Sequence, residues 1–290
     1  MRALAEQAGP GYGTSPRPSG RQGRAAFAFG RIPARTFVTR QHVGYPFHVT
    51  RPFYFDTDPA HLATLYLQSC SGGIYSADDL SIEIDAAPET AVHVTSQASA
   101  IVHDTRGVAA VQSVDVSVGD NAFVAYATDP LILFPGAEIE QSVNVTLAPG
   151  AAALVIDAIL SHDPAGESRP FGTYGSIVDI ADDGGRRLAV DRSRVLGIDL
   201  AGSLSPQGPY PAAASVFAAG LSPEVLSPDA MEAAVEAPGI LCGASPLPNN
   251  AGLGMRILAD GGVSLAKALD AVFTVVFAAR FGSNPGRRRK

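Results

Sequence analysis

The sequence predicts a mainly β protein whose strands form stacked sheets, followed by two α-helices in the last third of the chain. Three observations carry this prediction. Apolar and polar residues alternate through the middle of the chain, turn-forming residues separate the alternating segments, and helical spacing appears only near the end. Hydrophobic residues make up 46% and charged residues 17%, as in a folded protein, and the 30 Gly and 22 Pro suit frequent turns.

Strands are expected where apolar residues occupy every second position. The segments 80–85, 114–118 and 143–147 alternate in this way, so each presents one apolar face. Gly, Pro, Asn and Asp cluster between such segments without intervening helical spacing, which predicts stacked or sandwiched antiparallel sheets. Pro-Gly-Ala recurs at Pro135 and Pro149, which hints at a solenoid-like progression.

Two helices are expected after these strands. Ser227 supplies an N-cap and Pro228 a first-turn proline, after which residues 230–237 run in helical spacing until a Pro-Gly pair. A second helix is expected to begin near Ser264, with apolar residues recurring at three and four, and to end at Gly282. Packing against the protein's own sheet is the expected role of its apolar face.

The two ends of the chain differ from its middle. We expect a disordered basic leader over residues 1–23, one folded domain over residues 24–282 and a basic tail over residues 283–290. The leader is rich in Gly, Pro, Ser and Arg, and the tail closes on three Arg and one Lys. Such a tail can grip an acidic partner, but a solvated, frayed terminus is the simpler interpretation.

Charge and hydropathy exclude two classes of partner. A formal net charge of −7 argues against a general nucleic-acid binder, which needs a basic face to neutralise phosphates. No apolar segment marks a signal peptide, and the longest apolar run, residues 271–279, is about half of the ~20 residues that a bilayer requires. We therefore expect a soluble, cytoplasmic protein without a membrane partner.

The residues alone do not predict an active site. The 6 His form neither His-x-His nor HExxH, and the 2 Cys form no CxxC pair. A nucleophile elbow, a phosphate-binding loop and a dinucleotide fingerprint are also missing. Asp78 and Asp79 follow a Gly-Gly turn, where a carboxylate could cap backbone N–H groups or touch a hydrated cation. The residues favour the cap.

An ordered series of short motifs resembles the UreD (UreH) family of urease accessory proteins. The resemblance runs from about residue 24 to the final helix, in register and with few gaps. Each motif is weak by itself, whereas the whole series is specific. The segments that carry it are Gln-His-Val-Gly at 41–44, Val-Thr-Arg-Pro-Phe-Tyr at 49–54, Ser-Gly-Gly-Ile-Tyr-Ser-Ala-Asp-Asp-Leu at 71–80, Thr-Ser-Gln-Ala at 95–98, Pro-Leu-Ile-Leu-Phe-Pro-Gly-Ala at 130–137 and Gly-Glu at 166–167.

The resemblance implies a fold and a function. The fold would be a β-helix-like body of stacked sheets with two helices. The function would be that of a non-enzymatic chaperone that binds apo-urease and UreF, reaches UreG through UreF, and helps deliver nickel to the urease active site through an internal route. Ni²⁺ would pass transiently, with no tightly bound cofactor. Sparse oxygen ligands suit such a route, because several His or Cys ligands would hold nickel too tightly.

The resemblance also implies roles for single residues. Asp78 and Glu167 are expected to line the nickel route as carboxylates. The other motif residues are expected to build the architecture, with glycines at positive φ and the Pro and aromatic residues in packing. These residues are Arg51, Pro52, Tyr54, Gly72, Gly73, Thr95, Gln97 and Gly136.

A second class of function is compatible with a β-rich chain. A metal-dependent enzyme of cupin type or a carbohydrate-active enzyme of solenoid type would use the same strands and turns. A cupin requires His-x-His, which the sequence lacks, and a solenoid lyase or hydrolase requires clustered Asp, Lys or Arg on successive rungs, which cannot be traced. The order of the motifs favours the chaperone.

Overall fold

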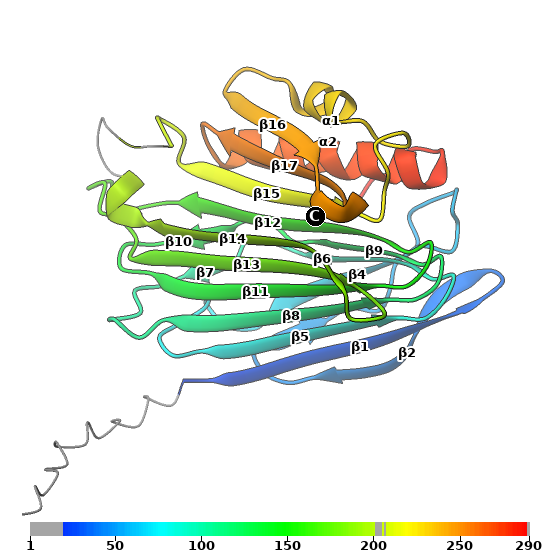
Figure 1. Cartoon of the computed structure of the whole chain (residues 1–290). Coiled ribbons are helices and arrows are strands. Elements are labelled where there is room, and N and C mark those ends of the chain that lie inside the picture. The colour runs from blue at the N-terminus through cyan, green and yellow to red at the C-terminus, as the bar shows by residue number, and fades with distance from the viewer. Residues whose placement is uncertain (1–19, 201–204, 206, 289–290) are drawn as a thin grey trace, which may run out of the picture.

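The chain winds back and forth between two stacked sheets, with two helices on the outer face of one of them (Figure 1). A computed structural model describes residues 20–200, 205 and 207–288. Sheet A has the strand order β14 (Arg187–Leu196), β13 (Thr173–Asp182), β11 (Glu138–Leu147), β8 (Ala110–Val118), β5 (Asp79–Ala86), β1 (Gln22–Ile32) and β2 (Arg35–Val43).

Sheet B lies behind sheet A and carries the helices. Its strand order is β16 (Ile240–Pro246), β17 (Gly252–Ala259), β15 (Ala212–Ala219), β12 (Ala152–Ser161), β9 (Phe123–Ala127), β6 (Ala91–Ser96), β4 (Ala63–Ser69) and β3 (Phe47–Val49). Two short strands, β7 (Ile101–Val102) and β10 (Leu131–Leu133), pair beside the end of β12. The short 3₁₀ helices are Gly197–Leu200 and Pro248–Asn250.

Strand direction differs from the antiparallel arrangement predicted from sequence. The path β1–β5–β8–β11–β13 in sheet A and the path β4–β6–β9–β12 in sheet B are parallel throughout. On the first path, β5, β8 and β11 are each followed by a crossing to sheet B before the chain returns, so successive strands of this path run in the same direction. The antiparallel prediction was wrong for these two paths, because alternation reports which face is buried and not which way the neighbour runs. It is confirmed toward the edges of both sheets, where β1–β2 and β13–β14 in sheet A and β3–β4, β12–β15, β15–β17 and β16–β17 in sheet B are antiparallel. The β-helix-like stacking itself is confirmed.

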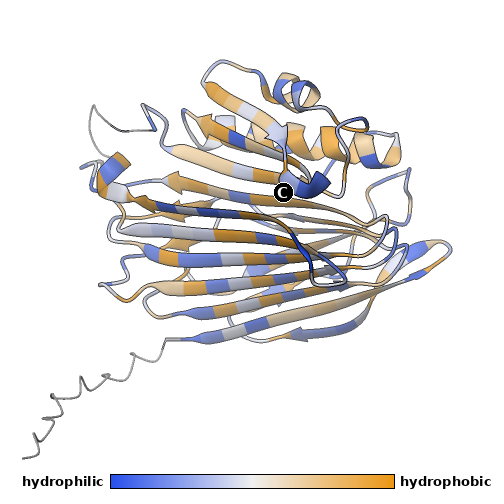
Figure 2. Cartoon of the chain, viewed as in Figure 1, coloured by the Kyte–Doolittle hydropathy of each residue, from blue (hydrophilic) through white to orange (hydrophobic). Residues whose placement is uncertain are grey.

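The alternation predicted from sequence is borne out strand by strand. Residues 80–85, 114–118 and 143–147 lie in β5, β8 and β11, where every second side chain is buried. Figure 2 shows the resulting change between hydrophilic and hydrophobic residues along the strands of sheet A. The inward faces of the two sheets form one apolar core, and the outer face of sheet B forms a second core with the helices.

Both helices form where the capping signals predicted them. Helix α1 (Pro228–Val235) is capped by Ser227, whose side chain accepts the Ala230 N–H, and it ends two residues before the predicted position. Helix α2 (Gly262–Phe281) ends at Gly282, which takes the left-handed conformation at φ 75°. Helix α2 is long and apolar enough to cross a membrane, but the core helix of a folded protein meets the same criterion. The apolar side of α2 packs on sheet B.

The ends of the chain are more ordered than predicted where the structure describes them. Gln22 and Gly23 of the expected leader belong to β1, and residues 1–19 lie outside the described part of the chain. The segment 283–288 of the expected tail packs against the body.

Candidate functional site

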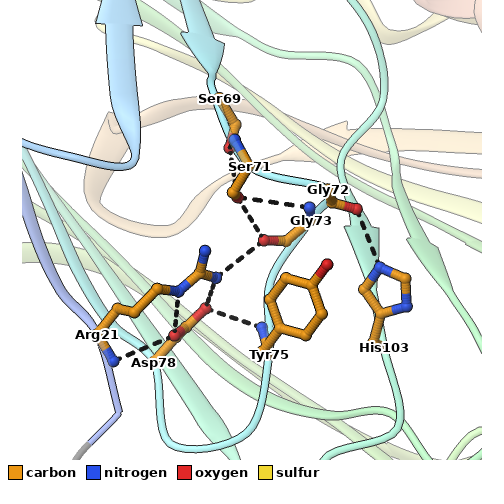
Figure 3. Close-up of polar contacts among 8 residues, drawn as sticks. All are labelled: Arg21, Ser69, Ser71, Gly72, Gly73, Tyr75, Asp78 and His103. Atoms are coloured by element: carbon orange, nitrogen blue, oxygen red, sulfur yellow. Dashed lines mark hydrogen bonds and ion pairs between the residues drawn. The ribbon is translucent and has the colours of Figure 1, made fainter.

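The loop that precedes β5 is anchored by a buried carboxylate (Figure 3). Asp78 is fully buried at its side chain and pairs with Arg21, whose side chain is 25% exposed. Its carboxylate also accepts the Arg21 N–H at 3.3 Å and the Tyr75 N–H at 2.8 Å, and Arg21 donates to the Gly73 carbonyl at 2.9 Å. Asp78 therefore caps backbone N–H groups, as the residues alone favoured. Its expected contact with nickel stays a prediction.

The two glycines of this loop differ in their backbone. Gly73 has φ 141°, and a Cβ built there would lie 2.3 Å from the Ile101 carbonyl oxygen. Gly72 does not have a positive φ, so the expectation of a left-handed residue was wrong there. Close contact explains Gly72 instead, since a Cβ would lie 2.7 Å from the Tyr75 hydroxyl oxygen. The Gly72 carbonyl also accepts a hydrogen bond from His103 Nε2 at 2.9 Å.

Gly73→Ala is expected to lower the free energy of unfolding by about 1–3 kcal/mol, because both the backbone conformation and the Ile101 oxygen oppose a Cβ. Chemical denaturation measures this loss. Gly107→Ala is the matched control, since Gly107 also has a positive φ of 79° but meets no atom within 4 Å. Equal losses for the two variants would contradict the close contact at Gly73.

The Arg-Pro-Phe-Tyr motif contacts β2 through Tyr54. Tyr54 donates its hydroxyl to the Thr36 carbonyl at 2.8 Å, and the Arg35 guanidinium lies 5.0 Å from the centre of its ring. Pro52 and Tyr54 are half-buried, whereas Arg51 is exposed. The motif thus ties the segment after β3 to β2.

The remaining motif residues, Thr95, Gln97 and Gly136, each contact a residue from another strand or loop. Thr95 is buried and donates to the Ala127 carbonyl at 2.7 Å, which joins β6 to β9. Gln97 accepts a hydrogen bond from Gln68. Gly136 has φ 74°, as expected of a motif glycine, and a Cβ there would lie 2.7 Å from an Asp104 side-chain oxygen.

Glu167 lies in a different loop, between β12 and β13. Its side chain is 66% exposed and lies 3.3 Å from Arg169. The centre of this loop is Asp163, which accepts backbone N–H groups from Ala165 and Glu167, while the Arg169 guanidinium lowers the pKa of its carboxyl below the usual range. The structure therefore gives Asp78 and Glu167 separate arginine partners. The expected role of Glu167 in a nickel route also stays a prediction.

A cavity of about 270 Å³ connects the motif loops with the space between the sheets. Gly72 and Gln97, which are exposed, line its outer part. Ile82, Gln112 and Tyr126 line its inner part, and all three are buried. The cavity thus leads from the motif loops to buried residues between the sheets, with a lining that is partly polar and mostly apolar.

A buried polar row continues from the inner end of this cavity. Gln112, Gln141 and Ser176 are paired in register on β8, β11 and β13, so they form one rung across the inner face of sheet A. Asp157 of β12 faces this rung from sheet B. Gln112 donates to Gln141 at 3.1 Å, Gln141 to Asp157 at 2.8 Å, and Ser176 to Asp157 at 2.6 Å. Tyr174 also donates its hydroxyl to Asp157.

The position of this row divides the interior. Apolar clusters lie on both sides of it, one around Val114, Val143 and Val178 and the other around Ala110 and Ile139. Polar side chains are costly in such a place unless they are hydrogen-bonded, and these four polar positions satisfy one another. The row runs across β8, β11 and β13, in the direction in which the strands of sheet A are hydrogen-bonded to one another.

Burial sets the electrostatics of the row. It raises the pKa of Asp157, and the hydrogen bonds from Ser176 and Tyr174 offset only part of that rise. Burial and then the neighbouring Asp157 charge raise the pKa of Tyr174, and burial raises that of Tyr126. The row therefore offers one buried carboxyl that holds its proton more strongly than a carboxyl in water.

Sequence reasoning missed this row, although signals for it existed. Gln112 and Gln141 occupy the same phase as the apolar residues of their strands, and Asp157 interrupts the otherwise apolar stretch 151–160. A polar residue on a buried strand face implies a hydrogen-bond partner inside the protein. Only the fold identifies that partner.

Among the residues that the structure describes, no group of three or more His, Cys, Asp or Glu side chains could hold a metal ion. The polar row presents amide, hydroxyl and carboxyl oxygens instead. Such oxygens bind late transition-metal ions such as Ni²⁺ more weakly than imidazole nitrogen or thiolate sulfur does.

Comparison with known proteins places the chain in a family. The model of the UreD urease accessory protein family matches residues 21–290. The chain is 42% identical over 291 residues to urease accessory protein UreD 1 of Methylorubrum extorquens (strain PA1), covering 100% of this chain and 99% of that protein. It is 40% identical to UreD 3 of Bradyrhizobium sp. (strain ORS 278), covering 93% and 96%. It is 34% identical to UreD 1 of Pseudomonas syringae pv. syringae (strain B728a), covering 92% and 95%. The chain belongs to the UreD family of urease accessory proteins.

Proposed function

We propose that this protein acts in urease maturation as a non-catalytic assembly factor that passes Ni²⁺ through its interior to apo-urease. The single observation that carries the route is the buried polar row of Gln112, Gln141, Ser176 and Asp157, which starts at the cavity behind the motif loops. A chain that only presented a binding surface would have no use for a polar row through an otherwise apolar core.

The chemistry of the row suits transit rather than storage. Ni²⁺ is bound tightly by several imidazoles or thiolates, and it would then leave too slowly for delivery. A single carboxyl among neutral oxygens attracts a divalent ion without enclosing it. Because the pKa of Asp157 is raised, its proton can leave as the ion arrives, and the carboxylate that forms offsets one of the two positive charges of Ni²⁺.

The proposed partners follow from the family. We infer that the protein binds apo-urease and UreF, that UreG joins through UreF, and that the complex assembles in the cytoplasm. Asp78 and Glu167, the two carboxylates expected to line the nickel route, lie in two different motif loops, where each pairs with an arginine. Asp157 is the better candidate for meeting the ion inside the protein.

Co-expression of a urease operon with and without this chain tests the proposal. Urease purified from cells that lack the chain should contain less nickel and show lower activity at equal protein concentration, and UreF should co-purify with the tagged chain. Both arms of the experiment carry all of the other accessory genes, so that they differ only in this chain. If urease acquires the same nickel content without the chain, the proposed function is wrong.

A further inference from the structure

The C-terminal segment 283–288 lies in a slot between the loop before β4 and helix α2. Ser283 donates its hydroxyl to the Asp58 carbonyl, and the Gly286 N–H donates to Asp56 Oδ1 at 2.7 Å. Gly286 fits so closely that a Cβ there would lie 1.9 Å from the Phe55 carbonyl oxygen. The segment is therefore bound at defined positions along its length.

Arg288 makes the central contact of this segment. Its guanidinium pairs with both oxygens of Asp56, Nη1 with Oδ1 at 3.0 Å and Nη2 with Oδ2 at 2.8 Å. The side chain of Arg288 is only 10% exposed and that of Asp56 only 1%. Arg288 Nε donates to His93 Nδ1 at 3.2 Å, and the guanidinium carbon lies 4.6 Å from the centre of the Phe273 ring. The expectation of a solvated, frayed terminus is wrong for this residue.

These contacts select a guanidinium and not a simple cation. Two parallel N–H groups meet the carboxylate, a third N–H meets the imidazole, and the flat face lies on an aromatic ring. An ammonium group can make the charge contact but has neither the planar fork nor the flat face. The adjacent Arg287 is exposed, so of the two tail arginines that the structure describes, Arg288 is the one that is bound.

Arg288 also lines a second cavity. A space of about 130 Å³ between sheet B and α2 is lined by Arg288, Thr95, Thr128 and Asp129. Thr128 and Asp129 also line the 270 Å³ cavity behind the motif loops. One thin wall thus separates the interior cavity from the slot that holds the C-terminal segment.

We propose that Asp56, His93 and Phe273 form a guanidinium-binding pocket, and that the chain's own segment 283–288 is its ligand and acts as a latch over the second cavity. This inference stands apart from nickel transfer, since it requires only the contacts around Arg288. The ligand class is an arginine side chain or a small alkylguanidinium.

Hydrogen exchange on the full-length protein tests the latch. In the wild type the Gly286 amide should be protected, because Asp56 accepts its N–H. In Arg288→Ala the segment 282–288 should exchange at least tenfold faster, as measured by mass spectrometry of the terminal peptide. Arg287→Ala is the matched control and should leave exchange unchanged, because Arg287 is exposed.

Chemical rescue tests the selectivity of the pocket. Millimolar ethylguanidinium should restore protection in Arg288→Ala, whereas ethylammonium at the same concentration should not, and Arg288→Lys should resemble Arg288→Ala. Unchanged exchange in Arg288→Ala would overturn the latch. Equal rescue by the two ions, or full protection in Arg288→Lys, would overturn the guanidinium pocket. Neither outcome depends on urease activity, so failure here is distinguishable from failure of the proposed function.

Discussion

Arg21→Ala is expected to lower the free energy of unfolding by about 3 kcal/mol, near the lower end of what removing one partner of a buried ion pair costs. The variant leaves the Asp78 carboxylate buried with only backbone donors to balance its charge. The loss should not reach the upper end of the range, because a quarter of the Arg21 side chain is exposed and the backbone N–H of residue 21 remains.

Equilibrium denaturation in urea measures this loss, and Arg24→Ala is its control. Arg24 also pairs with a carboxylate, Glu83, at 2.8 Å, but both side chains are largely exposed. Exposed pairs contribute little, so the control should stay close to the wild type. Asp78→Asn should be milder than Arg21→Ala, since the amide is neutral and Arg21 can turn to solvent. Equal stability of the Arg21 and Arg24 variants would contradict an anchoring role for Asp78.

Local features of the fold could be predicted because their causes are local. The alternation in 143–147 identifies a strand in β11, and the hydroxyl of Ser227 identifies the start of α1. Gly282 ends α2 because only a residue that tolerates positive φ fits there. In each case the residues that decide the structure are neighbours in the sequence.

The direction of the strands and the members of the site could not be predicted in this way. Arg21 and Asp78 are separated by 57 positions, and Arg288 and Asp56 by 232. Such pairs form only after the chain has crossed between sheets, and alternation is the same for parallel and antiparallel neighbours. The motif resemblance predicted the family and the β-helix-like stacking. The hydrogen-bond partners of Asp78 could be identified only in the folded structure.

Asp157→Leu is expected to lower the nickel content of urease matured with this chain by about tenfold or more. An apolar side chain at this position removes the only carboxyl that faces the buried rung of Gln112, Gln141 and Ser176 among the described contacts. An added barrier of only ~1.4 kcal/mol slows a transfer step about tenfold. Metal analysis of purified urease measures the effect, with UreF co-purification as the check that the variant still folds.

Asp115→Leu is the matched control for position. Asp115 lies on β8, the strand that also carries Gln112, but on the exposed outer face of sheet A, where Asn144 donates to it at 2.8 Å. A variant there changes the same charge without touching the interior, so nickel content should stay at the wild-type level. Equal losses for Asp115→Leu and Asp157→Leu would contradict a route through the polar row.

Asp157→Asn separates the carboxyl's charge from its hydrogen bonds. Burial raises the native pKa of Asp157 above its unfolded value of 3.8, so the native state binds more protons than the unfolded state between these two values. The wild-type free energy of unfolding should therefore fall, relative to that of Asp157→Asn, as the pH rises from about 3.8 through the native pKa. Denaturation at a series of pH values measures this difference. Parallel pH profiles would mean that Asp157 is not held in an apolar surrounding, and the polar row would then have no reason to hold or release a proton as an ion passes.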